Sequence, residues 1–155
     1  VTSRTALMEQ TTTMETTMSY PSWNQYQSRV RDLTKEEAAW VGALIEGEGW
    51  IRNRLGIPGA KARTVVGVGS TEIETIATLL RLVGDGRVSM ARTATRNRKL
   101  YWSWELANRP SVRVLLPQLL PYFTGKSDPA RLLLDQLDAR DLPASSENGG
   151  SENGT

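Results

Sequence analysis

At 155 residues the chain has room for one domain of ordinary size. It contains no cysteine and no histidine, which excludes disulfides, zinc sites made of thiolates, thiol nucleophiles and imidazole bases. A hydrolase built from this chain must therefore use carboxylates, lysine, hydroxyls and a metal ion that prefers oxygen ligands.

The net charge of +2 conceals an uneven distribution along the chain. Residues 50–113 hold twelve Lys and Arg against four Asp and Glu, whereas the rest of the chain holds seven against thirteen. A basic region in an otherwise acidic protein favours a surface that binds a polyanion. The alternative is an ordinary solvated surface that is basic.

The two ends of the chain differ in composition from its middle. Residues 1–31 are polar and rich in threonine, and residues 143–155 are rich in Ser, Asn and Gly, so we expect disordered tails around one domain at 32–142. The longest apolar runs are far shorter than a bilayer span, and the N-terminus lacks a signal-peptide pattern. We therefore expect no membrane association and a cytoplasmic, nucleoid-associated protein of bacterial or phage type, with an organellar location as the alternative.

The first predicted element of the domain is a helix. Thr34 is a good N-cap residue, and Glu37 three residues later completes a capping box. We expect the helix to run to about Glu46 and to end at Gly47 and Gly49, because glycine weakens a helix.

Two β-hairpins are predicted further along the chain. The first has strands over 50–55 and 61–69, and the second has strands over 87–93 and 100–107. Alternation in the last strand places four apolar side chains on one face, namely Leu100, Trp102, Trp104 and Leu106. The tryptophans that we interpret as packing residues rather than as platforms for stacked bases are Trp40, Trp50, Trp102 and Trp104.

Three more helices are predicted. Between the hairpins, Thr71 and Glu74 form a second capping box for a helix that ends at 84–86. Its apolar stripe consists of Ile73, Ile76, Ala77, Leu80 and Val83. After the second hairpin we expect a helix over 112–120, kinked by its proline, and a last helix over 128–137.

This order of elements predicts an α+β fold. The two hairpins form one four-stranded antiparallel sheet, with helices covering one face and the other face left to solvent. Because the basic residues fall mostly on the hairpins, the open face would be basic and suited to binding a nucleic-acid duplex.

The segment Val41 to Gly49, Val-Gly-Ala-Leu-Ile-Glu-Gly-Glu-Gly, resembles the nine-residue motif of the LAGLIDADG homing endonucleases, position by position. Later landmarks of that family are resembled by Gly-Asp-Gly-Arg-Val at 84–88, Trp-Glu-Leu at 104–106, and Leu-Pro-Tyr-Phe at 120–123 with Lys126. The resemblance covers most of residues 33–138. It implies the family's αββαββα fold, in which a four-stranded antiparallel β-saddle is covered by helices on one face.

One copy of the motif predicts a twofold homodimer with paired helices at its axis. Gly42 and Ala43 are small, so that two helix backbones can approach closely there. Two negatively charged helix ends would then meet and form a site for divalent cations, which with oxygen ligands suits Mg²⁺. The resemblance assigns Glu48 as the catalytic metal-binding acid, with the Gly47 carbonyl as a further ligand. We interpret Glu46 as an acid that supports the structure around the site.

The resemblance also indicates residues around the metal. Lys126 resembles the family's site lysine, which supports the attacking water or stabilises phosphate charge. The alternative is an ordinary solvated lysine. The family's polar residue at the end of the second strand falls on Gly69 or Ser70, with Ser70 the candidate to support the site. The basic residue sometimes found a few positions later is replaced by Ile73 or Glu74.

Candidate DNA contacts come from the hairpins. Alternation places Arg52 and Arg54 on the face opposite Ile51 and Leu55. The full set is Arg52, Arg54, Lys61, Arg63, Arg87, Ser89, Arg92, Arg96, Arg98, Lys99, Tyr101, Ser103 and Glu105. The sequence thus predicts a Mg²⁺-dependent, site-specific endonuclease for double-stranded DNA that acts as a homodimer. The alternative is a DNA-binding protein on the same scaffold that does not cleave, such as a regulator or a maturase-like protein.

Overall fold

The structure is a computed structural model that describes residues 27–59 and 61–141. Most of the two predicted tails lies outside these residues. The elements are α2 (Lys35–Glu48), β1 (Gly49–Asn53), β2 (Thr64–Ser70), α3 (Ile73–Val83), β3 (Arg87–Arg92), β4 (Tyr101–Leu106), α4 (Arg109–Leu119), the 3₁₀ helix η2 (Leu120–Tyr122) and α5 (Ser127–Asp141). Within the described ranges, no helix has the length and apolar character to cross a membrane.

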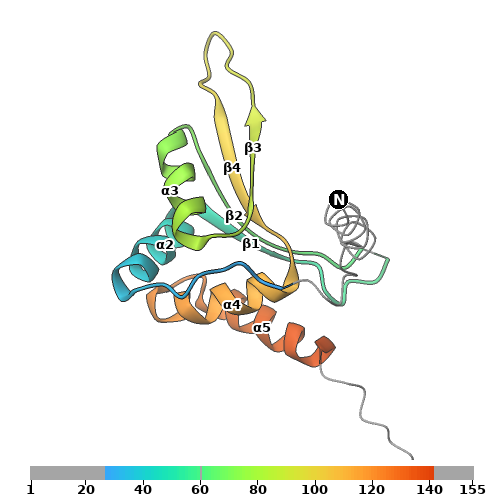
Figure 1. Cartoon of the computed structure of the whole chain (residues 1–155). Helices are drawn as coiled ribbons and strands as arrows, with labels where there is room; N and C mark the ends of the chain where they lie inside the picture. Colours follow the sequence, from blue (N-terminus) through green and yellow to red (C-terminus); the bar gives the residue numbers. More distant parts are fainter. Residues whose placement is uncertain (1–26, 60, 142–155) are drawn as a thin grey trace, which may run out of the picture.

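The four strands form one antiparallel sheet, as predicted, and their order in it is β1-β2-β4-β3. The helices pack on one face of this sheet, where Val66, Val68, Trp104 and Leu106 are fully buried. The opposite face carries the alternate residues of each strand, and we call it the open face. Figure 1 shows the β3–β4 hairpin extending beyond the helices.

Helix α2 confirms one capping prediction and corrects its predicted end. Thr34 and Glu37 form the capping box. The helix continues through Gly47 to Glu48, and Gly49 ends it by donating its backbone N–H to the carbonyl of Ile45. Gly49 is also the first residue of β1, so the helix leads directly into the sheet.

Helix α3 does not have the predicted capping box. Its N-cap is Glu72, whose side chain makes no capping hydrogen bond, and the Ser70 hydroxyl accepts the Glu72 N–H instead at 3.0 Å. The buried stripe also differs from the prediction, because Ile73 and Ala77 are exposed whereas Leu79 is fully buried.

Several predicted bounds shift by a few residues. Both strands of each hairpin are shorter than predicted, and Leu100 is exposed and precedes β4. Helix α4 begins earlier, because the Asn108 side chain caps it by accepting the Ser111 N–H at 2.8 Å. Before α2, the backbone N–H of Arg31 donates to the carbonyl of Val83 at 2.9 Å, so the folded unit begins before residue 32.

Candidate functional site

The C-terminal end of α2 is fastened to the loop that precedes α5. The Glu46 carboxylate accepts hydrogen bonds from the backbone N–H groups of Thr124 at 3.2 Å, Gly125 at 2.6 Å and Lys126 at 3.1 Å. In return, Nζ of Lys126 donates to the Glu46 carbonyl at 2.6 Å. Partial burial alone would raise the pKa of Glu46, but these three N–H groups and the charge of Lys126 outweigh it and lower that pKa. These contacts give Glu46 a structural role.

Glu48, two residues further on, has different surroundings. Its side chain is exposed and makes no hydrogen bond or ion pair with any other described residue. Gly47 is exposed as well, and a Cβ atom placed on it would meet nothing within 4 Å. A carboxylate at the C-terminal end of a helix offers the oxygen ligands that Mg²⁺ prefers.

One protomer does not complete a metal site on its own. Among the described residues there is no group of three or more acidic side chains that could hold a metal ion. The donor chemistry of Glu48 fits a hard cation, but a single carboxylate is a small part of a ligand set.

The other residues expected near the metal make local contacts. Lys126 is partly buried, and its ammonium group pairs with the end of α2 as described above. The Ser70 hydroxyl is engaged with the start of α3, and Glu74 is exposed in the first turn of that helix. In the described part of the chain, neither Ser70 nor Glu74 hydrogen-bonds to Glu48.

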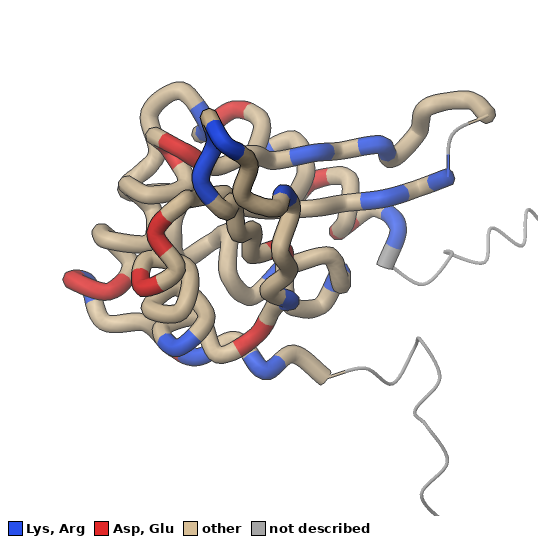
Figure 2. Tube along the Cα trace, turned by 90° about the horizontal axis from the view of Figure 1, so that it is seen from above, with Lys and Arg blue, Asp and Glu red and all other residues tan. Residues whose placement is uncertain are grey.

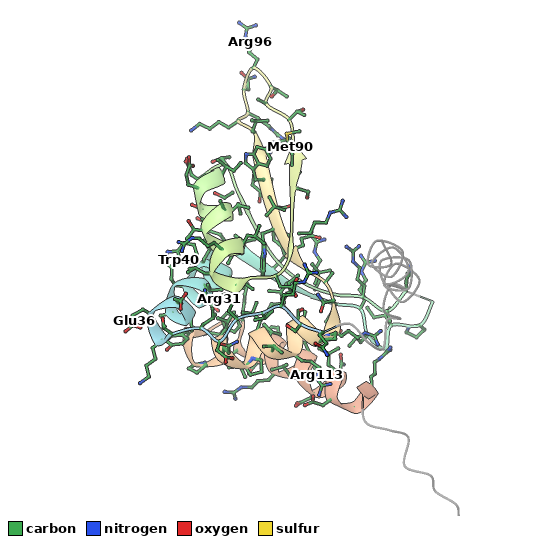
Figure 3. The ribbon with its side chains drawn as sticks, viewed as in Figure 1. Arg31, Glu36, Trp40, Met90, Arg96 and Arg113 are labelled. Carbon is green, nitrogen blue, oxygen red and sulfur yellow. The ribbon has the colours of Figure 1, made fainter. Side chains whose placement is uncertain are left out.

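One face of α2 is left uncovered by the rest of the protomer. Trp40, Ala43 and Gly47 are exposed and Leu44 is half-buried, at the spacing i, i+3, i+4 and i+7 that places side chains on one side of a helix. Trp40 was expected to pack inside, but it is 39% exposed. Figure 3 shows it with Glu36 at the outer side of α2. We call these four residues the α2 stripe.

Gly42 packs closely against residues of its own chain. It is buried, and a Cβ atom on it would lie 2.9 Å from Cβ of Tyr122 and 3.8 Å from the carbonyl oxygen of Leu119. The close approach that this glycine permits is therefore to η2 and the end of α4. Of the two small residues predicted at a dimer interface, Ala43 is the one on the exposed stripe.

The open face gathers the predicted DNA contacts. Figure 2 shows Lys and Arg spaced along the extended arm formed by β1, β2 and the segment between them, and Figure 3 shows Arg96 at the far end of the β3–β4 hairpin. By register, the candidates on the strands of this face are Arg52, Arg87, Ser89, Arg92, Tyr101, Ser103 and Glu105. Those in the segments that join the strands are Arg54, Lys61, Arg63, Arg96, Arg98 and Lys99.

Polar contacts link several of these side chains to one another. Arg63 approaches Glu105 at 3.8 Å, and the hydroxyls of Ser89 and Ser103 lie 3.1 Å apart. Ser103 is buried, so Ser89 is the more accessible of the two hydroxyls. The first pair links the segment before β2 to β4, and the second links β3 to β4.

Sequence reasoning misplaced one residue of the open face. Trp50 was interpreted as a packing residue, yet it lies on the open face next to Gly67 of β2, with the guanidinium of Arg52 over its ring. The strand alternation carries a signal that would have found it, because Trp50 and Arg52 are two residues apart and therefore share a face.

Comparison with known proteins identifies the fold. No protein-family profile and no curated protein sequence matches the chain. The homing endonuclease I-CvuI in complex with its target in the presence of Ca is 20% identical, with a TM-score of 0.52 over 67% of each chain. I-CvuI with the I-CreI target in the presence of Mg, whose DNA is not cleaved, matches with a TM-score of 0.51, 20% identity and 67% of each chain. The LAGLIDADG meganuclease I-CpaMI bound to uncleaved DNA is 15% identical, with a TM-score of 0.50 over 66% of this chain and 37% of that one. The chain thus has the fold of the LAGLIDADG homing endonucleases, as the motif predicted.

Proposed function

We propose that this protein is a site-specific endonuclease for double-stranded DNA that works as a homodimer and requires Mg²⁺. The observation that carries the proposal is the state of Glu48, an exposed acid without a partner among the described residues, at the end of a helix whose other motif acid is engaged in the fold. An acid that stabilises nothing in its own protomer is available for a ligand.

The open face is the proposed DNA-binding surface. Its basic residues and those of the joining segments would contact the phosphates and bases of the duplex, and the β3–β4 hairpin has the two-stranded form that fits a major groove. The solved structures of similar fold include proteins bound to DNA, which supports the same use of this scaffold.

The α2 stripe is the proposed dimer interface. A tryptophan that is 39% exposed, next to two small residues on the same helix face, is suited to contact an identical helix. Pairing the helices at this stripe would bring the two Glu48 side chains together and would complete the acid set that one protomer lacks.

Glu48 and the Gly47 carbonyl would hold the metal ions. Bound Mg²⁺ supplies an activated water and stabilises the leaving oxygen of the phosphodiester. Lys126 would contribute positive charge close to the scissile phosphate, because its ammonium group is held at the carbonyl of Glu46, two residues before Glu48.

A DNA-binding protein that does not cleave is the second candidate. It is favoured by the engagement of the Ser70 hydroxyl in the turn before α3 and by the acidic Glu74 in place of a basic residue. Both departures would weaken the support of the attacking water and leave DNA binding intact.

The experiment begins with selection of the bound sequence from a random duplex library by the full chain in Ca²⁺, followed by incubation of the selected DNA with Mg²⁺. We expect cleavage of both strands, lost in Glu48→Gln while binding is retained. The matched control is Asp135→Asn, which neutralises an exposed carboxylate on α5 and should leave cleavage unchanged. Tight, salt-dependent binding without cleavage by the unaltered protein would establish the non-cleaving candidate.

A further inference from the structure

Two glycines of the central strand β2 lie on the open face, and each is covered by an aromatic ring. A Cβ atom on Gly67 would lie 2.5 Å from the ring of Trp50, and one on Gly69 would collide with the hydroxyl and ring of Tyr101. Only glycine lets the two rings approach the β2 backbone this closely. The rings come from both sides of β2, since Trp50 is on β1 and Tyr101 is on β4.

An arginine guanidinium group lies over each ring. The guanidinium carbon of Arg52 lies 5.4 Å from the ring centroid of Trp50, and that of Arg92 lies 5.2 Å from the ring centroid of Tyr101. We call these two arrangements of glycine, ring and guanidinium the arginine stacks. A guanidinium over an aromatic face is attracted to it and loses rotational freedom.

The second stack depends on an irregularity in β3. Val88 and Met90 pair with tryptophans on the helix-covered face, so regular alternation would direct Arg92 to that face as well. A register shift between Met90 and Arg92 inserts one residue and pairs Arg92 with Tyr101. The bulge therefore turns this arginine to the open face.

The stacked arginines are held without using their hydrogen-bonding ends. Within the described residues neither Arg52 nor Arg92 makes a hydrogen bond or an ion pair, and Nε of Arg92 is buried without a partner. Arg63, in the segment before β2, differs because it approaches Glu105 on β4. Apart from the buried Nε of Arg92, the guanidinium N–H groups of the two arginines are therefore available to a ligand.

We propose that Arg52 and Arg92 each read a guanine in the bound duplex, and that Trp50 and Tyr101 are positioning residues that orient the two guanidinium groups. The inference rests on the DNA binding proposed above. A planar guanidinium can donate two parallel hydrogen bonds to O6 and N7 of guanine in the major groove. In a twofold dimer this gives two guanine positions in each half-site, while the unstacked basic residues contact phosphates without regard to sequence.

The test is binding-site selection with the full-length protein in Ca²⁺, comparing base preferences at every position. We expect guanine at two positions per half-site. Arg52→Lys keeps the charge but loses the paired donors, so it should reduce the guanine preference about tenfold or more at one position. Arg92→Lys should do the same at the other. The matched control Arg131→Lys changes an exposed arginine on α5, outside the open face, and should leave the base preferences unaltered.

Replacement of Trp50 tests whether its ring orients the guanidinium group of Arg52. Trp50→Leu should cause the same local loss as Arg52→Lys, without changing the salt dependence of binding, whereas Trp50→Phe keeps a ring and should restore the preference. A purely structural role for Trp50 predicts a lower melting temperature and a uniform loss at all positions, which would overturn the positioning claim. If neither Trp50 variant folds, the Arg52→Lys and Arg92→Lys profiles decide the proposal.

Failure of this inference and failure of the proposed function give different results. A wild-type protein that enriches no sequence and binds no DNA overturns both. If the wild-type protein selects a defined site and the guanine preference is unchanged in both Arg52→Lys and Arg92→Lys, only the guanine-reading role is overturned.

Discussion

Replacing Trp40 with alanine tests the proposed dimer at the residue where we expect the largest loss of dimerisation free energy. The tryptophan is 39% exposed in the protomer, which for a large aromatic side chain is roughly 100 Å², or about 200 Å² for the two copies in a twofold dimer. At about 25 cal/mol per Å², complete burial of this surface would stabilise the dimer by at most about 5 kcal/mol. Allowing for incomplete burial, Trp40→Ala should weaken dimerisation by about 2–5 kcal/mol, or roughly thirty-fold to several thousand-fold in Kd.

Sedimentation equilibrium over a concentration series, with and without duplex DNA, measures this change. Leu132→Ala is the matched control, because Leu132 is 55% exposed and lies on α5, away from the stripe. It should leave the dimer constant unchanged. A wild-type protein that stays monomeric throughout, or a Trp40→Ala variant that dimerises as the wild type does, would refute the assignment of the interface to the α2 stripe.

Three further predictions concern the fold and the DNA-binding surface. The pKa of Glu46 is lowered in the folded protein. The ionised Glu46 carboxylate therefore stabilises the fold above its unfolded pKa near 4.5, and this stabilisation is lost as the pH falls through the lowered pKa. Between pH 5 and 3, the free energy of unfolding in urea should depend less on pH in Glu46→Gln than in the wild type. Gly42→Val overpacks the contact with Tyr122 and should lower the free energy of unfolding by about 1–3 kcal/mol, whereas Gly47→Ala meets no atom and should raise it by up to about 1 kcal/mol, both measured by urea unfolding at a concentration where the protein is monomeric. Arg96→Ala removes a charge at the hairpin tip and should reduce the slope of log K against log salt by about one per protomer without changing base preference, as fluorescence anisotropy titrations would show.

The sequence was sufficient for the order of the elements along the chain and for one four-stranded antiparallel sheet, because these follow from local patterns. The strand order β1-β2-β4-β3 also depends on the tertiary pairing of β2 with β4. The two capping boxes show where local patterns fail. Thr34 and Thr71 are each followed by Glu three residues later, but only the first pair caps a helix. At the second, the Ser70 hydroxyl accepts the Glu72 N–H, and the helix begins at Ile73. The hydroxyls of Ser70 and Thr71 can both accept a backbone N–H at the start of this helix, and the sequence pattern does not indicate which of them does so.

Residues that act through tertiary contacts were harder to place. The motif indicates that Gly42 and Ala43 are small for a packing reason, but which of them faces another helix depends on where η2 lies. The side of the sheet on which Arg92 lies depends on a bulge that has no clear mark in the residues around it. Trp50, by contrast, was within reach of the sequence, because its alternation with Arg52 already indicated the open face.

The two acids of the motif differ in their contacts at one helix end. Successive helical residues are about 100° apart, so Glu46 and Glu48 point in directions about 200° apart and cannot share one site. Glu46 is directed toward the 124–126 loop, whose three N–H groups and Lys126 compensate its charge. Glu48 is consequently on the outer side, and no described residue compensates its charge. The loop held by Glu46 also carries Lys126, so Glu46 fixes this lysine at the helix end that bears Glu48, the proposed catalytic acid. The loss of either acid should therefore affect the proposed cleavage for a different physical reason.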